Sequence, residues 1–259
     1  MSVYKLGYKP SPTDRVGDGH PEHLLKLAAP LPPSASVRDS VVEVLDQGQS
    51  SSCVAHAVTQ LTRTALVRQG VKNPPLPSRL FVYYMARAEN GEQNEDAGTF
   101  IHSAFDAMTA LGFPPEDAWP FSDDPTRINT QPDFAAIRAA ADMRWLANRY
   151  RITSTGTQRV QDVKAALAGG HGVAWGTEVD AAIFDLHPGD VWPGCLGPSE
   201  GGHATMICGY GPGYFEVCNS WGQGYCDNGF FRVSESAVAS PKASDFWVGT
   251  IAPQFSEVA

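Results

Sequence analysis

The 259-residue chain is long enough for one large domain or two lobes with a substantial core. Its formal net charge of −9 argues against a nucleic acid or an anionic membrane as a partner. No apolar stretch approaches the ~20 residues of a spanning helix, and the first ten residues lack the apolar core of a secretory signal. We therefore expect a cytoplasmic protein, with signal-independent secretion left open.

The first half of the chain reads as an extended arm followed by helices. Residues 1–36 contain six prolines, which predicts an arm with at most one short helix near residues 21–27. From Cys53 to about Gln69, apolar residues recur every three or four positions, and Gly70 follows as a stop signal. This pattern predicts a helix that begins at Cys53. Further helices are predicted over residues 78–89, 100–111 and 133–146.

After Tyr150 the pattern changes to strands. A helix over residues 160–167 precedes strands at residues 172–179, 203–210, 214–218, 229–233 and 246–251. Helices followed by antiparallel strands predict an α+β fold of two lobes. We place the arm at residues 1–36 and the main domain at residues 37–259. Within that domain, the helical lobe covers about 37–145 and the β lobe about 146–259.

The chain has five cysteines, an odd and low number that excludes a disulfide-dense scaffold. None forms a CxxC pair, and no Cys/His pair has zinc-finger spacing, so no metal is expected. Cys208 and Cys218 flank a Gly-Pro-Gly turn and could face each other across a hairpin. Two buried, reduced thiols are the favoured interpretation of this pair.

Cys53 is the candidate nucleophile because of its place in the chain. At a helix start, the free N–H groups and the helix dipole favour a thiolate. A cysteine alone is more often a core thiol. However, Gln47 lies six residues upstream. Its side-chain amide can join the Cys53 backbone N–H in donating to the oxyanion of a tetrahedral intermediate.

The remaining catalytic parts lie near the end of the chain. His203 begins a predicted strand after two glycines, and Asn219 follows sixteen residues later in a tight turn. The Asn219 amide can fix the orientation of the imidazole, while Trp221 shields their hydrogen bond from water. A thiol, an imidazole and two amides in this order indicate a nucleophilic cysteine hydrolase. A GxSxG match at residues 197–201 lacks the strand and helix that a nucleophilic serine needs, so we attribute it to chance.

These segments resemble the papain-like cysteine peptidases, and the opening of the chain at residues 6–10 and 13–15 looks more like that of their short, prokaryotic, xylellain-like branch. The resemblance rests on the Asp-Gln-Gly loop before the nucleophile, the strand from His203 to Gly211, the Asn-Ser-Trp-Gly segment at residues 219–222 and the glycine segment near residue 98. It covers about residues 37–250. It implies the papain-like two-lobe fold, in which a helical lobe and an antiparallel, β-barrel-like lobe enclose the active site in the cleft between them. The implied catalytic residues are Cys53, His203, Asn219 and Gln47, and the implied substrate-binding residues are Gly98, Thr99, Gly202, Ala204 and Trp221.

The resemblance implies a monomeric cysteine endopeptidase that acts on a peptide or protein through a thioester acyl-enzyme, with no cofactor. Two alternatives stay open: an acyl transferase or transpeptidase with the same triad, and a non-catalytic peptide-binding module. The chain departs from the family where Ser50 replaces a cysteine that normally anchors a disulfide, with Asp96 near the position of its partner. The arm is also too short for the family's helical propeptide. It either packs across the cleft or wraps the outside.

Overall fold

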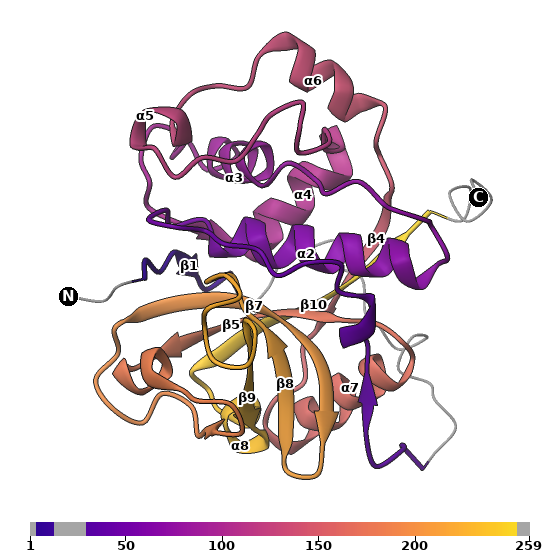
Figure 1. The fold of residues 1–259 in the computed structure, drawn as a ribbon, viewed down its shortest axis with the longest axis vertical. Helices are drawn as coiled ribbons and strands as arrows, with labels where there is room; N and C mark the ends of the chain where they lie inside the picture. Colours follow the sequence, from indigo (N-terminus) through magenta and orange to yellow (C-terminus); the bar gives the residue numbers. More distant parts are fainter. Residues whose placement is uncertain (1–3, 13–29, 253–259) are drawn as a thin grey trace.

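The computed structural model describes residues 4–12 and 30–252 (Figure 1). The short helix predicted near residues 21–27 lies outside this part of the chain. Figure 1 shows a helical half above a curved sheet, with residues 4–12 running between the two halves. This arrangement confirms the predicted α+β class.

The helical half is built around α2, whose apolar stripe is fully buried. The helices of this half are α2 (Cys53–Arg68), α3 (Arg79–Ala88), α4 (Ile101–Leu111), α5 (Pro125–Ile128) and α6 (Phe134–Ala141), preceded by a 3-10 turn at Arg38–Ser40. Side chains cap three of them, and Asp124 does so for α5 by accepting hydrogen bonds from the Thr126 and Arg127 N–H groups. Ser78 Oγ accepts a hydrogen bond from the Phe81 N–H at the start of α3, and Asp133 does the same for Ala136 in α6. The helices predicted over residues 53–69, 78–89 and 100–111 are confirmed.

The second half is a sheet with the strand order β4-β10-β5-β7-β8-β9-β6 and with β2 added beside β7. Its strands are β2 (Ala35–Ser36), β4 (Leu146–Ile152), β5 (Val173–Val179), β6 (Val191–Trp192), β7 (Gly201–Gly211), β8 (Tyr214–Cys218), β9 (Phe230–Ser234) and β10 (Ala243–Ile251). All pairings are antiparallel except that of β6 with β9. A second, two-stranded sheet joins β1 (Tyr8–Lys9) to β3 (Thr99–Phe100).

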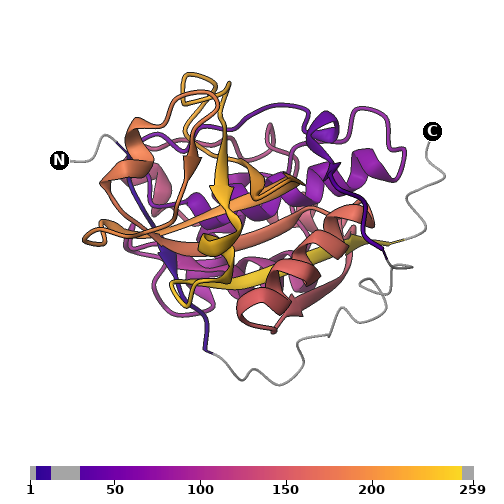
Figure 2. The ribbon, with the colours of Figure 1, turned by 90° about the horizontal axis from the view of Figure 1, so that it is seen from below.

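Each face of the large sheet carries its own core. Ala174 on β5 packs into the core that contains α2, whereas its neighbours Val173 and Trp175 join the core that contains α7 (Gly156–Ala168). This alternation is the period of two expected for a strand buried on both faces. Figure 2 shows α7 and α8 (Glu235–Ala239) on the side of the sheet turned away from the helical half. The sheet therefore presents β7 directly to α2.

The prediction of a helix over residues 133–146 was wrong at its C-terminal end. The helix α6 stops at Ala141, and Leu146 already begins β4. The alanine-rich sequence favours a helix locally, but β4 pairs with β10, which lies about a hundred residues later. A partner so distant in sequence leaves no local signal. Among the described residues, no helix is both long and apolar enough to span a membrane.

Candidate active site

Cys53 is the first residue of α2, and its side chain is completely buried. Hydrogen bonding from the backbone of Ala204 and of Gly7 lowers the pKa of this thiol. These contacts favour the thiolate, but the stronger effect is burial, which raises the pKa of the Cys53 thiol to about 11. The thiol is therefore neutral while the site is closed. It lies beside Ala204, the residue that follows His203.

His203 and Asn219 form the predicted pair. His203 Nε2 lies 2.8 Å from Asn219 Oδ1, which also accepts a hydrogen bond from the Ser220 N–H. The shared oxygen acceptor assigns the ring proton to Nε2 and leaves Nδ1 as the basic nitrogen. Trp221 stacks on the imidazole with ring centroids 4.6 Å apart. Burial lowers the pKa of His203 to about 4, so its ring is also neutral in the closed site.

Gln47 lies in the loop that leads into α2, and its side-chain amide is held at both ends. Its Oε1 accepts a hydrogen bond of 2.7 Å from Ser220 Oγ, and its Nε2 donates to Ser50 O at 2.8 Å. The same Nε2 donates to the carbonyl oxygen of Lys5 at 3.1 Å. Gln47 thus already donates to a peptide carbonyl, here one from the chain's own N-terminal segment.

Residues 4–12, which we call the arm strand, run alongside the thiol. The Gly7 N–H donates to Gly202 O at 3.1 Å, and the Thr99 N–H donates to Gly7 O at 2.9 Å. Gly98 has φ +76°, and a Cβ atom there would lie only 2.0 Å from Gly7 O. Tyr4 of the arm strand also stacks on Trp221 with ring centroids 4.4 Å apart. The arm strand therefore contacts four of the residues predicted to bind substrate: Gly98, Thr99, Gly202 and Trp221.

Tyr8 anchors the arm strand in a buried pocket. Its hydroxyl donates to Asp245 Oδ2 at 2.8 Å and lies 2.5 Å from Ser244 Oγ. Arg151 donates to the other oxygen of the Asp245 carboxylate at 2.8 Å. The phenol ring packs so closely on Gly176 that a Cβ atom there would lie 2.1 Å from it. Sequence reasoning missed this pocket because Tyr8 is separated by 237 positions from Asp245, its hydrogen-bond partner.

Asp96 lies near the position of the cysteine partner implied by the resemblance. It accepts hydrogen bonds from the Ser51 N–H at 2.9 Å and from the Tyr83 hydroxyl at 2.7 Å, and it forms an ion pair with Lys5. All five cysteines are free thiols, which confirms the interpretation of Cys208 and Cys218 as reduced and buried. A carboxylate, rather than a disulfide, therefore ties the nucleophile loop to α3 and to the arm strand.

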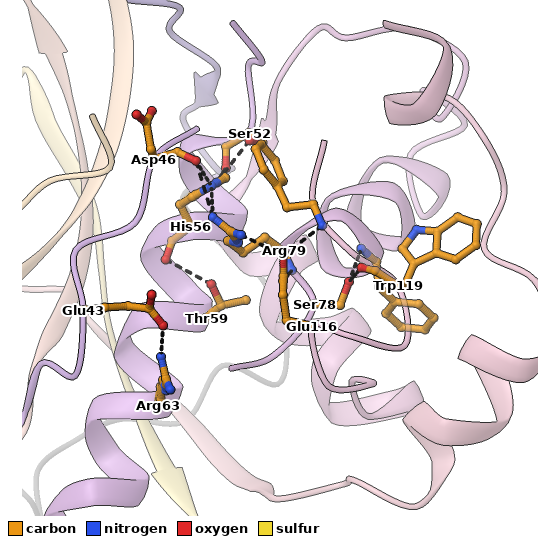
Figure 3. Close-up of polar contacts among 12 residues, drawn as sticks. Glu43, Asp46, Ser52, His56, Thr59, Arg63, Ser78, Arg79, Glu116 and Trp119 are labelled. Atoms are coloured by element: carbon orange, nitrogen blue, oxygen red, sulfur yellow. Dashed lines mark hydrogen bonds and ion pairs between the residues drawn. The ribbon is translucent and has the colours of Figure 1, made fainter. Parts of the chain in front are cut away.

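His56 lies one turn after Cys53 on α2, between the two ends of the Gln47 loop (Figure 3), and its neutral ring can donate to only one of the two carbonyl oxygens that flank it. Its Nδ1 lies 3.0 Å from Ser52 O, and its Nε2 lies 3.2 Å from Asp46 O. Arg79 NH1 also donates to Asp46 O, and Glu116 holds the guanidinium at 2.7 Å. Burial, assisted by the charge of Arg79, lowers the pKa of His56 to about 3. The role of His56 could not be predicted from the sequence, because nothing in its local pattern distinguishes it from a core residue.

Because His203 and His56 are buried and neutral, we predict that the fold loses stability in acid. The unfolded chain binds a proton at each histidine below about pH 6.5, whereas His203 and His56 in the folded chain do so only near 4 and 3. Their contribution is fully present above pH 6.5 and falls with pH by up to about 1.4 kcal/mol per pH unit for each histidine. Urea unfolding between pH 7 and 4 measures this slope. The variant His56→Gln should reduce it, and the exposed control His187→Gln should not; equal slopes in all three proteins would contradict the argument.

The comparisons with known proteins give the family. Residues 31–245 match the family model of the papain family cysteine proteases. The chain belongs to this family and is a papain-like cysteine protease.

Among the described residues, no group of three or more His, Cys, Asp or Glu side chains is arranged to hold a metal ion.

The structure is similar to that of xylellain, a cysteine protease from Xylella fastidiosa, with a TM-score of 0.85 and 26% sequence identity over 95% of this chain and 96% of that one. An uncharacterized peptidase C1-like protein of Acanthamoeba polyphaga mimivirus is 29% identical over 214 residues, which are 79% of this chain and 68% of that protein. A cathepsin B-like protein of Giardia intestinalis is 26% identical over 205 residues, or 74% of this chain and 64% of that protein.

The variant Gln47→Ala tests the role of the Gln47 amide. Loss of one oxyanion donor is expected to lower kcat by about 10²-fold. KM should change little, because the donor acts on charge that develops in the transition state. Steady-state kinetics on a peptide substrate measure both constants. The matched control is Gln49→Ala, a nearby glutamine in the same loop. A kcat for Gln47→Ala within twofold of the wild-type value would contradict the assignment.

Proposed function

We propose that this protease hydrolyses peptide bonds with Cys53 as nucleophile, His203 as general base and acid, and Asn219 as the group that orients His203. The Gln47 amide and the Cys53 N–H form the oxyanion hole. The observation that carries the proposal is the donation of Gln47 Nε2 to the peptide carbonyl of Lys5, in the same arm strand whose Gly7 backbone interacts with the buried Cys53 thiol. The His203–Asn219 hydrogen bond supports the orienting role of the amide.

The reaction proceeds in two displacements. The Cys53 proton moves to His203 Nδ1, and the sulfur forms a bond to the carbonyl carbon. His203 then gives this proton to the leaving amine as the C–N bond breaks, which leaves a thioester. Water attacks the thioester, His203 takes a proton from it, and the thiol is restored as the acid product leaves.

The arm strand blocks this reaction as long as it occupies the site. It contacts Gly98, Thr99 and Gly202 through its backbone and accepts the hydrogen bond of Gln47. It also keeps Cys53 and His203 away from water, which favours the neutral forms of both groups. Departure of the arm strand admits water and substrate, so that burial no longer opposes a thiolate–imidazolium pair.

Product analysis tests the proposed activity. The full chain is incubated with a peptide substrate, with and without an added amine such as glycinamide, and the products are identified by mass spectrometry. A protease releases mainly the free acid at all amine concentrations, whereas a transpeptidase transfers the acyl group to the amine. A non-catalytic module gives neither product, and an electrophilic peptide would label its Cys53 no faster than it labels the His203→Ala variant.

A further inference from the structure

A small polar cavity lies behind the His203–Asn219 pair, between α2 and the adjoining ends of β7 and β8. Its space for the centre of a water molecule is about 10 Å³. Gln60 from α2, Thr205 from β7 and Asn219 are among the residues that line it. All of its lining residues are at most 4% exposed.

Three side-chain amide atoms of residues that line this cavity lack protein partners among the described residues: both of those of Gln60 and one of Asn219. Within the described residues, neither Nε2 nor Oε1 of Gln60 makes a hydrogen bond, and Asn219 Nδ2 makes none either. Buried amides left unpaired are costly, and nearly all buried polar groups are paired with protein or with ordered water. His56 also lines the cavity, but both of its ring nitrogens lie against backbone carbonyls. It therefore offers these amides no partner.

We propose that this cavity binds one water molecule, which accepts a hydrogen bond from Asn219 Nδ2 and joins it to the Gln60 amide. The available space suits a single water, and such a site needs two to four polar partners. A third partner is Thr205, whose Oγ1 accepts a hydrogen bond from Trp175 Nε1 at 2.8 Å and can give its own proton to the water. Gln60 is then a positioning residue for Asn219.

The water would favour the catalytic orientation of the Asn219 amide. Asn219 Oδ1 faces two donors, His203 Nε2–H and the Ser220 N–H, so a flipped amide would turn its own N–H groups toward them. The water, which accepts a hydrogen bond from Nδ2 on the side away from His203, favours the same, unflipped orientation of the Asn219 amide. The effect on catalysis rests on the proposed function, because it acts through the orientation of His203. Whether a water molecule occupies the cavity does not depend on the proposed function.

The test compares Gln60→Leu with the control Thr62→Val. Leucine has a similar size to glutamine and no polar atoms, and Thr62 is buried on the same helix but does not line the cavity. Both changes are made in full-length chains that also carry Tyr8→Ala, so that the arm strand is equally weakened in each. For Gln60→Leu we expect an about 10-fold lower kcat, an unchanged KM and a Tm about 3 °C lower. A crystal structure of the parent protein should show water density within hydrogen-bond distance of both Gln60 and Asn219.

Two results would overturn the proposal. One is a cavity without density in a well-ordered crystal. The other is a Gln60→Leu protein whose Tm rises and whose kcat is unchanged, since leucine stabilises a site in which the amide was unpaired. If the full-length chain that carries only Tyr8→Ala cleaves no peptide, the proposed function fails. The density and the Tm still decide whether the water is bound.

Discussion

Replacing Cys53 with alanine is expected to abolish peptide hydrolysis, with a loss in kcat of at least about 10⁴-fold. In the proposed mechanism Cys53 forms the covalent acyl intermediate, and loss of the nucleophile in triad enzymes leaves only the contribution of binding and of the oxyanion hole. Steady-state kinetics measure the loss. Mass spectrometry after reaction with a peptide aldehyde or chloromethyl ketone reports whether residue 53 carries the adduct. His203→Ala should lower the rate of adduct formation but leave the site of attachment unchanged.

The sharpest control for this prediction is Cys195→Ala. Cys195 is also buried, and Lys242 Nζ lies 3.5 Å from its sulfur, so it is another thiol with a cationic neighbour. It belongs to the core that contains α7, whereas Cys53 belongs to the core that contains α2, and its removal should leave kcat unchanged. If the Cys53→Ala protein keeps its activity and the Cys195→Ala protein is inactive, the nucleophile is Cys195 and the assignment of Cys53 is wrong.

The candidate site was accessible to sequence reasoning because its signals are local. Cys53 carries a helix start and an upstream glutamine, and His203 is linked to Asn219 by one strand, a turn and a second strand. Each of these spacings is preserved whenever the flanking elements form. The fold class followed in the same way from periodicities of three to four residues in the first half and of two in the second.

Features that depend on distant contacts could not be predicted. The Tyr8–Asp245 bond joins residues 237 positions apart, and no pattern around either residue indicates the other. The strand β4 was hidden by an alanine-rich context and exists through its pairing with β10. The unpaired amide of Gln60 is also invisible in the sequence, because a glutamine on a helix is most often exposed.

Replacing Tyr8 with alanine is expected to release the arm strand and raise peptide turnover. The change removes a buried aromatic ring and its hydrogen bonds to Asp245 and Ser244. A buried aromatic truncated to alanine costs about 4 kcal/mol, which corresponds to a factor of about 10³ in the equilibrium between covered and open cleft. The gain in turnover reaches this factor only if fewer than about one wild-type molecule in 10³ is open. Initial rates of peptide cleavage and of Cys53 alkylation by iodoacetamide measure the opening.

Two variants separate release of the arm from general destabilisation. Tyr8→Phe keeps the ring against Gly176 and loses only the hydroxyl, so we expect an increase of about 10-fold, the value of a hydrogen bond to a carboxylate. Phe134→Ala removes an aromatic ring of similar size that is 79% exposed on α6, and it should change neither rate. If Tyr8→Ala leaves both the cleavage rate and the alkylation rate of Cys53 at their wild-type values, the arm strand does not limit access to the site. A rise in alkylation without a rise in cleavage would instead show that the cleft opens but that the exposed thiol lacks the proposed activity.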